Sequence, residues 1–188
     1  TLCVMKRLHF FILCILFCTY CGPYTTKVSA QTHQKYLEST THEERAARRA
    51  ARLEEFEKYI DSLVLSRNFE FNPQTMQQLP AGTMRLISNA LYNVTLWRGT
   101  MDVCLPYIAG FTPPYRYVLL NTGSPSLNDM KVQQTEGGWV VSFKTNLYAS
   151  MIYTFTFEIS SRYGGANLTI SNNWYSPVQY SGTITKIY

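Results

Sequence analysis

Histidine is almost missing from this sequence, and that absence limits the chemistry the chain can perform. Of 188 residues only three are histidines, His9, His33 and His42, and all three precede the region with strand-like patterns. Nucleophilic catalysis by serine or cysteine needs a base held beside the nucleophile, most often histidine. We therefore expect neither a Ser-His-Asp or Cys-His catalytic set nor a zinc site built from histidine and cysteine.

Cysteine is also scarce once the N-terminal segment is set aside. Four of the five cysteines lie within the first 21 residues, which leaves Cys104 alone in the rest of the chain. A single thiol forms no internal disulfide, so the domain must be held together by packing. We expect Cys104 to be a small, half-buried strand residue. The alternatives are an intermolecular disulfide or a reactive thiol, which would need a depressed pKa.

Carboxylates supply few candidates for catalysis. Asp102 and Glu158 alternate with the apolar residues of their strands, so we expect both to face solvent. A glycosidase needs two carboxylates facing across a cleft, and no such pair is indicated. No glycine-rich loop follows a strand and opens a helix, as nucleotide binding requires. We predict no enzyme activity and no cofactor or metal; a hydrolase is the most distant alternative. The carboxylates of the strand region are Glu70, Asp102, Asp129, Glu136 and Glu158.

The net charge gives no reason to expect a nucleic acid partner. The chain has 17 Lys and Arg against 12 Asp and Glu, but Lys6, Arg7 and Lys27 lie near the N-terminus. The other 14 basic residues nearly balance the 12 acidic ones, whereas a nucleic-acid-binding domain usually shows a clear basic excess.

The first 30 residues have the pattern of a secretory signal peptide. Lys6-Arg7 is a positive start, Leu8–Cys21 is almost continuously apolar, and Val28–Ala30 offers small residues to signal peptidase. The apolar run is shorter than the roughly 20 residues that span a bilayer. We predict cleavage after Ala30, a periplasmic or secreted chain that begins at Gln31, and no transmembrane segment after processing. The alternatives are a lipoprotein attached through a leader cysteine and an uncleaved anchor.

A long amphipathic helix is predicted after a flexible lead-in at residues 31–40. Thr41 has the character of an N-cap, Glu44 completes a capping box, and residues 43–66 contain neither glycine nor proline. Glu54 and Lys58 have the favoured spacing for an ion pair. We expect the C-terminal half of the helix to pack on a sheet and the first half to run past the sheet edge. One helical stripe holds Leu53, Phe56, Ile60, Leu63 and Val64, continued toward the start by Arg45, Arg48, Arg49 and Arg52.

From residue 69 the hydrophobic period changes to two, which is typical of β-strands. Short alternating segments follow one another with no helix between them, which predicts an antiparallel meander. We expect the first strand to end at Asn72-Pro73, residues 110–126 to be mostly loop, and Asp129–Thr135 to be a polar edge strand. The predicted fold is α+β, a single domain over residues 41–188 with the helix packed on the sheet, which is either a sandwich or a curved half-barrel.

Five motifs occur in an order that resembles a known family. They are Ser66–Phe71, Leu105–Tyr107, Gly138-Trp139, Gly165–Asn173 and Tyr180–Ile184. The ordered set resembles the family catalogued as domain of unknown function 4251, small exported proteins of Bacteroides-like bacteria, and covers most of the chain. The resemblance implies the helix-plus-sheet fold and an exported location. It implies no mechanism, because the function of the family is unknown.

Aromatic residues interleaved with prolines between Tyr107 and Tyr117 form the first candidate binding surface. Aromatic rings with a hydrogen-bonding tip suit contacts with sugars, peptides or proteins. The competing interpretation is a loop that folds back and caps the core. The candidate ligand contacts are Tyr107, Phe111, Tyr115, Arg116, Tyr117 and, after Asn172-Asn173, Trp174.

The arginine stripe of the helix has two interpretations. It is either a solvated face balanced by neighbouring glutamates or a contact with an anionic membrane surface or an acidic partner. Taken together, these observations predict an exported, non-catalytic binding module for a glycan, a peptide or an envelope protein, acting through the aromatic loop or an open sheet face. The alternative is a structural or assembly factor of the envelope that uses the Asp129–Thr135 edge or the Arg45, Arg48, Arg49 and Arg52 stripe.

Overall fold

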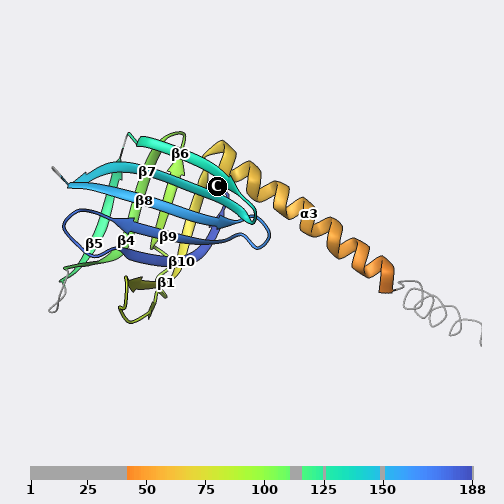
Figure 1. Cartoon of the computed structure of the whole chain (residues 1–188), viewed down its shortest axis with the longest axis horizontal. Coiled ribbons are helices and arrows are strands. Elements are labelled where there is room, and N and C mark those ends of the chain that lie inside the picture. The colour runs from red at the N-terminus through yellow and green to blue at the C-terminus, as the bar shows by residue number, and fades with distance from the viewer. Residues whose placement is uncertain (1–41, 111–115, 125, 149–150, 188) are drawn as a thin grey trace, which may run out of the picture. The chain divides into compact units, whose positions relative to one another are not determined.

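The computed structural model describes residues 42–110, 116–124, 126–148 and 151–187. They form one helix and ten strands, which confirms the coarse prediction of an α+β fold with an antiparallel sheet (Figure 1). The predicted signal peptide, the lead-in and the Thr41 cap lie outside the described residues. The elements are α3 (His42–Ser66), β1 (Phe69–Gln78), β2 (Arg85–Leu86), β3 (Asn93–Trp97), β4 (Thr100–Ala109), β5 (Arg116–Ser124), β6 (Asn128–Thr135), β7 (Gly138–Tyr148), β8 (Met151–Ser160), β9 (Gly165–Ser171) and β10 (Val178–Thr185).

The chain divides into two compact units, residues 1–49 and residues 50–188. The described part of the first unit is the start of α3, where the side chains from Glu44 to Arg49 are exposed. Within the second unit, Lys58 Nζ lies 2.7 Å from Glu54 Oε1, as predicted from their spacing. In the described ranges, no helix combines the length and the hydropathy needed to cross a membrane.

The last turns of α3 carry its buried residues. Ile60, Leu63 and Val64 belong to the same buried core as the inward-facing residues of the sheet, whereas Phe56 is exposed. The predicted apolar stripe is therefore buried at its C-terminal end. Arg67 adopts a left-handed conformation with a φ of 55°, and its N–H donates to the Val64 carbonyl, which ends the helix.

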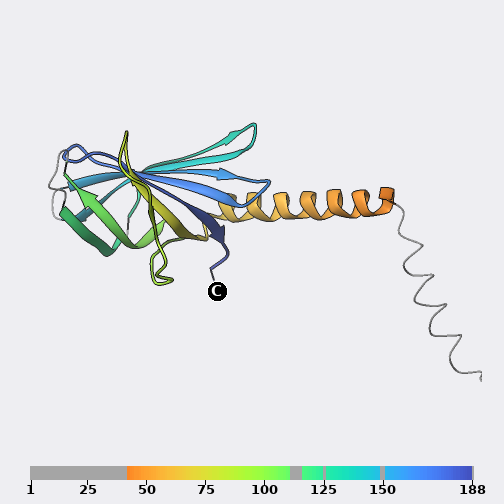
Figure 2. The ribbon, with the colours of Figure 1, turned by 90° about the horizontal axis from the view of Figure 1, so that it is seen from below.

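The ten strands belong to one antiparallel sheet with the order β5-β4-β3-β1-β10-β9-β8-β7-β6, and β2 pairs with β1. Two runs of hairpins, β3 to β5 and β6 to β10, meet at β1, which pairs with β3 on one side and β10 on the other (Figure 2). The β6 strand is an edge, as predicted, and β5 is the other edge. Both edges come from segments with few inward-facing apolar residues.

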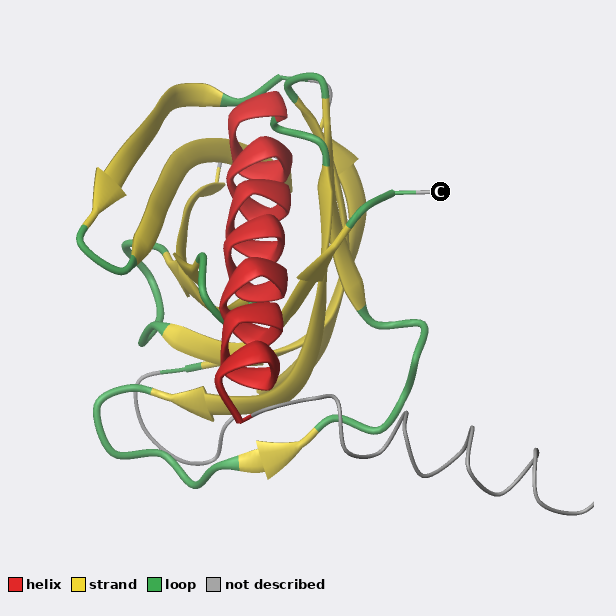
Figure 3. Ribbon diagram, turned by 90° about the vertical axis from the view of Figure 1, so that its right-hand side faces the viewer, coloured by secondary structure: helices red, strands yellow, loops and turns green. Residues whose placement is uncertain are grey.

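The sheet is strongly curved around its core (Figure 3). The centroid of the Phe157 ring on β8 lies 5.5 Å from that of Phe69 and 5.7 Å from that of Phe71, both on β1. In a flat sheet, strands three places apart would be separated by about 14 Å. The two ends of the sheet also approach each other, because the Tyr148 hydroxyl of β7, the strand next to the β6 edge, donates to the Leu119 carbonyl of β5 at 3.3 Å.

Two predicted boundaries are wrong. The β1 strand continues through Pro73 to Gln78, with a register shift between Pro73 and Thr75. On one side of β1, the pairing with β3 ends at Phe71 and the pairing with β2 begins at Thr75. Pro73 lies between them and has no strand partner on that side, which is why a proline is tolerated in the strand. The predicted loop at 110–126 contains β5, whose residues pair with β4 from Arg116 to Ser124. The strand was missed because Tyr117, Val118 and Leu119 are exposed in succession before the buried Leu120, so its apolar residues do not alternate with polar ones.

Candidate functional site

The predicted aromatic surface begins with a core residue. Tyr107 lies on β4, and its side chain is 1% exposed. Its ring packs edge-on against Tyr153 of β8, with the centroids 6.1 Å apart. Burial raises the pKa of Tyr107 strongly, and Tyr153 and Tyr175 add to the effect. The position of Tyr107 agrees with the competing, core-capping interpretation. Phe111 and Tyr115 lie outside the described residues.

Arg116 and Tyr117 open the edge strand β5, and both side chains are exposed. The Arg85 guanidinium lies over the Tyr117 ring, 4.9 Å from its centroid. Such a cation–π contact holds the ring at the surface, where Tyr117 is 54% exposed. Tyr117 is therefore available at the surface, but as part of a strand edge and not as part of a loop.

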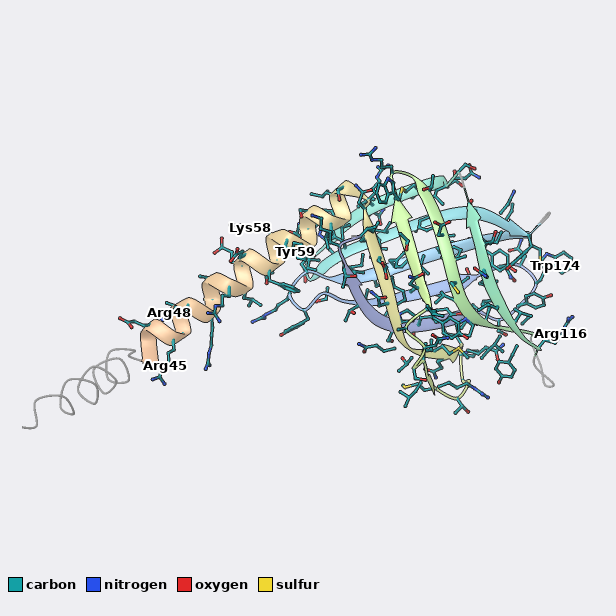
Figure 4. The ribbon with its side chains drawn as sticks, turned by 180° about the vertical axis from the view of Figure 1, so that it is seen from behind. Arg45, Arg48, Lys58, Tyr59, Arg116 and Trp174 are labelled. Carbon is teal, nitrogen blue, oxygen red and sulfur yellow. The ribbon has the colours of Figure 1, made fainter. Side chains whose placement is uncertain are left out.

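Trp174 occupies the connection between β9 and β10 and is 65% exposed. Its backbone N–H and that of Tyr175 both donate to Asn172 Oδ1, at 2.8 and 2.7 Å, which makes a tight turn. Figure 4 shows Trp174 and Arg116 toward the same end of the sheet. No contact between these two predicted ligand residues is observed among the described residues.

The arginine stripe is exposed on α3. Arg45, Arg48, Arg49 and Arg52 all face solvent, and Figure 4 shows Arg45 and Arg48 on the first turns of the helix. Arg45 takes part in a further interaction. Exposure is compatible with either interpretation of the stripe, so a partner at this face stays a prediction.

A groove of about 660 Å³, here called the outer-face groove, lies on the outer side of the sheet. It crosses β7 to β10 and reaches Gln74 at the irregular part of β1. Four of its residues form one cross-strand row, since each is paired in register with the next: Val140, Glu158, Asn167 and Ser181. Ser181 Oγ donates to Asn167 Oδ1 at 2.7 Å, which orients the amide in the groove.

Uncharged polar side chains dominate the outer face of these strands. The next row of residues in register, one pleat further along, contains hydroxyl and amide groups and no charge on β7 to β10. Alternation predicted the solvent-facing position of Glu158, which belongs to the first of these rows. The groove itself was missed, because it depends on the register of strands distant in sequence. The second row is Ser142, Thr156, Thr169 and Gln179.

The turn between β8 and β9 forms one wall of the groove. Tyr163 projects from this turn with most of its side chain exposed, and the Arg162 guanidinium lies 5.6 Å from its ring centroid. A Cβ atom added to Gly165 would meet no atom within 4 Å. The missing side chain therefore leaves open space at this position of the lining.

The groove presents binding groups and no recognisable catalytic set. Glu158 is exposed, as predicted, and is the single carboxylate in the described lining. Asp102 and Cys104 lie on β4; Asp102 is exposed and Cys104 is half-buried, as predicted for both. In the described ranges, no group of three or more His, Cys, Asp or Glu side chains is arranged to hold a metal ion.

Comparisons with known proteins place the fold. A family model described as domain of unknown function (DUF4251) matches residues 51–184. The chain is similar to the crystal structure of a DUF4251 family protein from Bacteroides eggerthii, with a TM-score of 0.53 and 15% identity. That match covers 69% of this chain and 87% of the other. At this identity the likeness shows a shared fold alone. No curated protein matches the chain.

Proposed function

The chain belongs to the DUF4251 family, as its ordered motifs predicted, and on that premise we propose that it is an exported, non-catalytic module that binds a glycan in the outer-face groove. The observation that supports this function is the lining of the groove. A carboxylate, amides and a hydroxyl lie in one continuous surface next to an exposed tyrosine: Glu158, Asn167, Gln74, Ser181 and Tyr163.

The chemistry of the lining favours a sugar over a peptide strand. The backbone groups of β7 to β10 are already paired within the sheet, so a ligand on the outer face meets side chains and not a free edge. Sugar hydroxyls both donate and accept hydrogen bonds, which matches carboxylate, amide and hydroxyl groups. The Tyr163 ring offers an apolar face with a polar tip beside them.

A binding role also agrees with the single carboxylate. Glycoside hydrolysis needs a second carboxyl group across the scissile bond, and Glu158 has no such neighbour in the described lining. Glu158 is instead suited to accept hydrogen bonds from two neighbouring hydroxyls of one sugar.

The test is a titration with neutral oligosaccharides, followed through the three tryptophan indole N–H signals in nuclear magnetic resonance spectra. We use cellohexaose, maltohexaose and xylohexaose as probes. Trp139 lines the groove, whereas Trp97 and Trp174 do not, so binding there should move the Trp139 signal selectively. Gly165→Leu should fill the groove and weaken binding at least about tenfold. Ser142→Leu, on the same face but outside the groove, is the matched control.

Two results would contradict this function. One is the absence of binding by all three probes at millimolar concentrations. The other is binding that Gly165→Leu leaves unchanged, since the groove would then not be the site. Asn167→Ala distinguishes the loss of a hydrogen-bonding group from steric blocking, because it removes an amide without filling the groove.

The β5 edge favours a second candidate function, envelope assembly by strand pairing. Tyr117, Val118 and Leu119 are exposed in succession on this edge, whereas the predicted edge β6 is polar and carries the Lys144–Asp129 ion pair on its side of the sheet. An apolar edge is a template for an extended peptide segment of a partner. A photo-cross-linker at Tyr117 should then capture one envelope protein in cells, and Val118→Lys should abolish capture.

We also propose that the protein is exported. The mature chain is expected to start at Gln31 and to reside in the periplasm or outside the cell. The intact mass of the protein from its own envelope tests this. A mass starting at Gln31 supports soluble export, an added lipid supports the lipoprotein alternative, and an unprocessed N-terminus supports a retained anchor.

A further inference from the structure

A second cavity lies where the end of α3 meets the turn between β3 and β4. This helix-end pocket has a volume of about 490 Å³, within the usual range for sites that bind small molecules. It shares no residue with the outer-face groove. Its lining consists of Tyr59, Ser62, Leu63, Ser66, Asn68, Trp97, Arg98, Lys186 and Ile187.

Two aromatic rings and two cations meet in this pocket, and its lining contains no carboxylate. Trp97 is 49% exposed although it is the largest side chain of its strand, and Tyr59 is exposed on the helix. The Arg98 guanidinium lies over the Trp97 ring, 5.9 Å from the centroid. Arg98 and Lys186 therefore give the pocket a positive charge that no acidic group of its own lining neutralises.

The turn that holds Arg98 is under backbone strain. Arg98 has a φ of 48° and Gly99 a φ of 89°, the pattern of a tight hairpin turn in which asparagine or glycine is preferred at the first position. The Arg98 N–H donates to Asn68 Oδ1 at 3.0 Å, which connects the turn to the segment between α3 and β1. Arginine at a left-handed position is unfavourable for the backbone, so its presence points to a role for the guanidinium.

The serine hydroxyls restrict what the ligand must offer. Ser62 Oγ donates to the Tyr59 carbonyl at 2.7 Å, and Ser66 Oγ donates to the Leu63 carbonyl at 3.0 Å. Their protons are therefore in use, while their oxygen lone pairs remain to accept hydrogen bonds. A complementary ligand brings hydroxyl donors for the serines, an anion for the cations and an apolar ring face for Trp97.

We propose that the helix-end pocket binds an acidic sugar of monosaccharide size, with its carboxylate toward Arg98 and Lys186 and its ring against Trp97. This site is separate from the outer-face groove and does not depend on glycan binding there. A uronic acid meets all three requirements, since it has a carboxylate, several hydroxyl donors and an apolar ring face. An aromatic carboxylate lacks the donors, and a neutral sugar lacks the charge.

The experiment titrates the full chain with D-glucuronate, D-glucose and benzoate and follows the same indole signals. Glucuronate should move the Trp97 signal and leave those of Trp139 and Trp174 in place. It should bind at least about tenfold more tightly than glucose or benzoate, and more weakly as salt is added. Arg98→Asn, which suits the turn, and Lys186→Gln should each weaken glucuronate binding. Arg162→Gln is the matched control, since Arg162 also lies over an aromatic ring.

The outcomes separate the two sites. Gly165→Leu should leave glucuronate binding unchanged, and Arg98→Asn should leave neutral oligosaccharide binding unchanged. Glucose or benzoate binding as tightly as glucuronate would overturn the proposal, as would an unmoved Trp97 signal. The proposal would also be overturned if Arg98 and Lys186 only stabilised the end of the helix. In that case Arg98→Asn and Lys186→Gln would lower the melting temperature and leave the affinity for glucuronate unchanged.

Discussion

Trp139 donates its indole N–H to Asp61 Oδ1 over 2.7 Å, which joins the start of β7 to the last part of α3. The same carboxylate oxygen accepts a hydrogen bond from Ser161 Oγ, also at 2.7 Å, from the turn between β8 and β9. Asp61 thus connects the helix to a strand and to a turn that are 78 and 100 residues away along the chain. Trp139 is also one of the residues that line the outer-face groove.

Asp61→Ala should destabilise the fold. The variant leaves the mostly buried indole N–H of Trp139 without an acceptor, and such a loss costs about 1–3 kcal/mol of unfolding free energy. Chemical denaturation measures the difference. Glu55→Ala, which removes an exposed carboxylate from the same helix, should have little effect. Equal stabilities of the two variants would show that the hydrogen bonds to Asp61 contribute nothing net.

This contact could not be predicted from the sequence. The helix that carries Asp61 and the alternating strands were predicted, but no pattern indicated Asp61 and Trp139 as partners. Whether they meet depends on where the helix crosses the curved sheet, and local patterns do not contain that information. The helix-end pocket was missed for the same reason, since Tyr59, Trp97 and Lys186 come from three distant segments.

Tyr180→Phe and Tyr107→Phe should have opposite consequences for stability. The Tyr180 hydroxyl donates to the Pro106 carbonyl at 2.7 Å, whereas the Tyr107 hydroxyl has no partner among the described residues. Removing the bonded hydroxyl should cost about 0.5–1.5 kcal/mol, while removing the unpaired one should be neutral or stabilising. Thermal or chemical unfolding of both variants provides the comparison. A clear loss in Tyr107→Phe would indicate that its hydroxyl is bonded after all.

The buried tyrosines should make the protein sensitive to alkaline pH. Burial raises the pKa of Tyr180 well above its ordinary value of 10.0, and Tyr107 adds to the effect. Above pH 10 the unfolded chain loses this proton while the folded protein keeps it, so the unfolding free energy falls as pH rises. Each such tyrosine contributes a slope of up to about 1.4 kcal/mol per pH unit.

The difference between wild type and Tyr180→Phe tests this dependence. Their stability curves should run parallel below pH 10 and converge above it, because the variant lacks the group whose ionisation the fold opposes. Surface lysines titrate in both proteins and cancel in the difference. A constant difference across the alkaline range would mean that the Tyr180 hydroxyl ionises equally in the folded and unfolded states.

The alternation of apolar and polar residues predicted the central strands, because each of them buries one face. It failed for β5, where successive apolar residues are exposed. The β5 strand buries Leu120 and exposes Tyr117, Val118 and Leu119, so its pattern did not indicate a strand. Asn167 and Ser181 lie on the outer face of their strands, where both line the groove. Their role as a polar row became visible once the register aligned β9 with β10.

Neighbouring glycines should respond differently to the same substitution. Gly164 has a φ of 63°, and an added Cβ would lie 3.1 Å from the Phe56 ring and 3.3 Å from Ile60 Cδ1. Gly164→Ala should therefore destabilise the protein by about 1 kcal/mol or more, through backbone strain and crowding. Gly165→Ala meets open space in a strand and should be neutral or stabilising by about 0.4–1 kcal/mol. This contrast matters for the groove. If the Gly165 variants remain stably folded, a loss of oligosaccharide binding in Gly165→Leu results from the space that the leucine fills. If Gly165→Ala unfolded as readily as Gly164→Ala, the groove would not be open at this position.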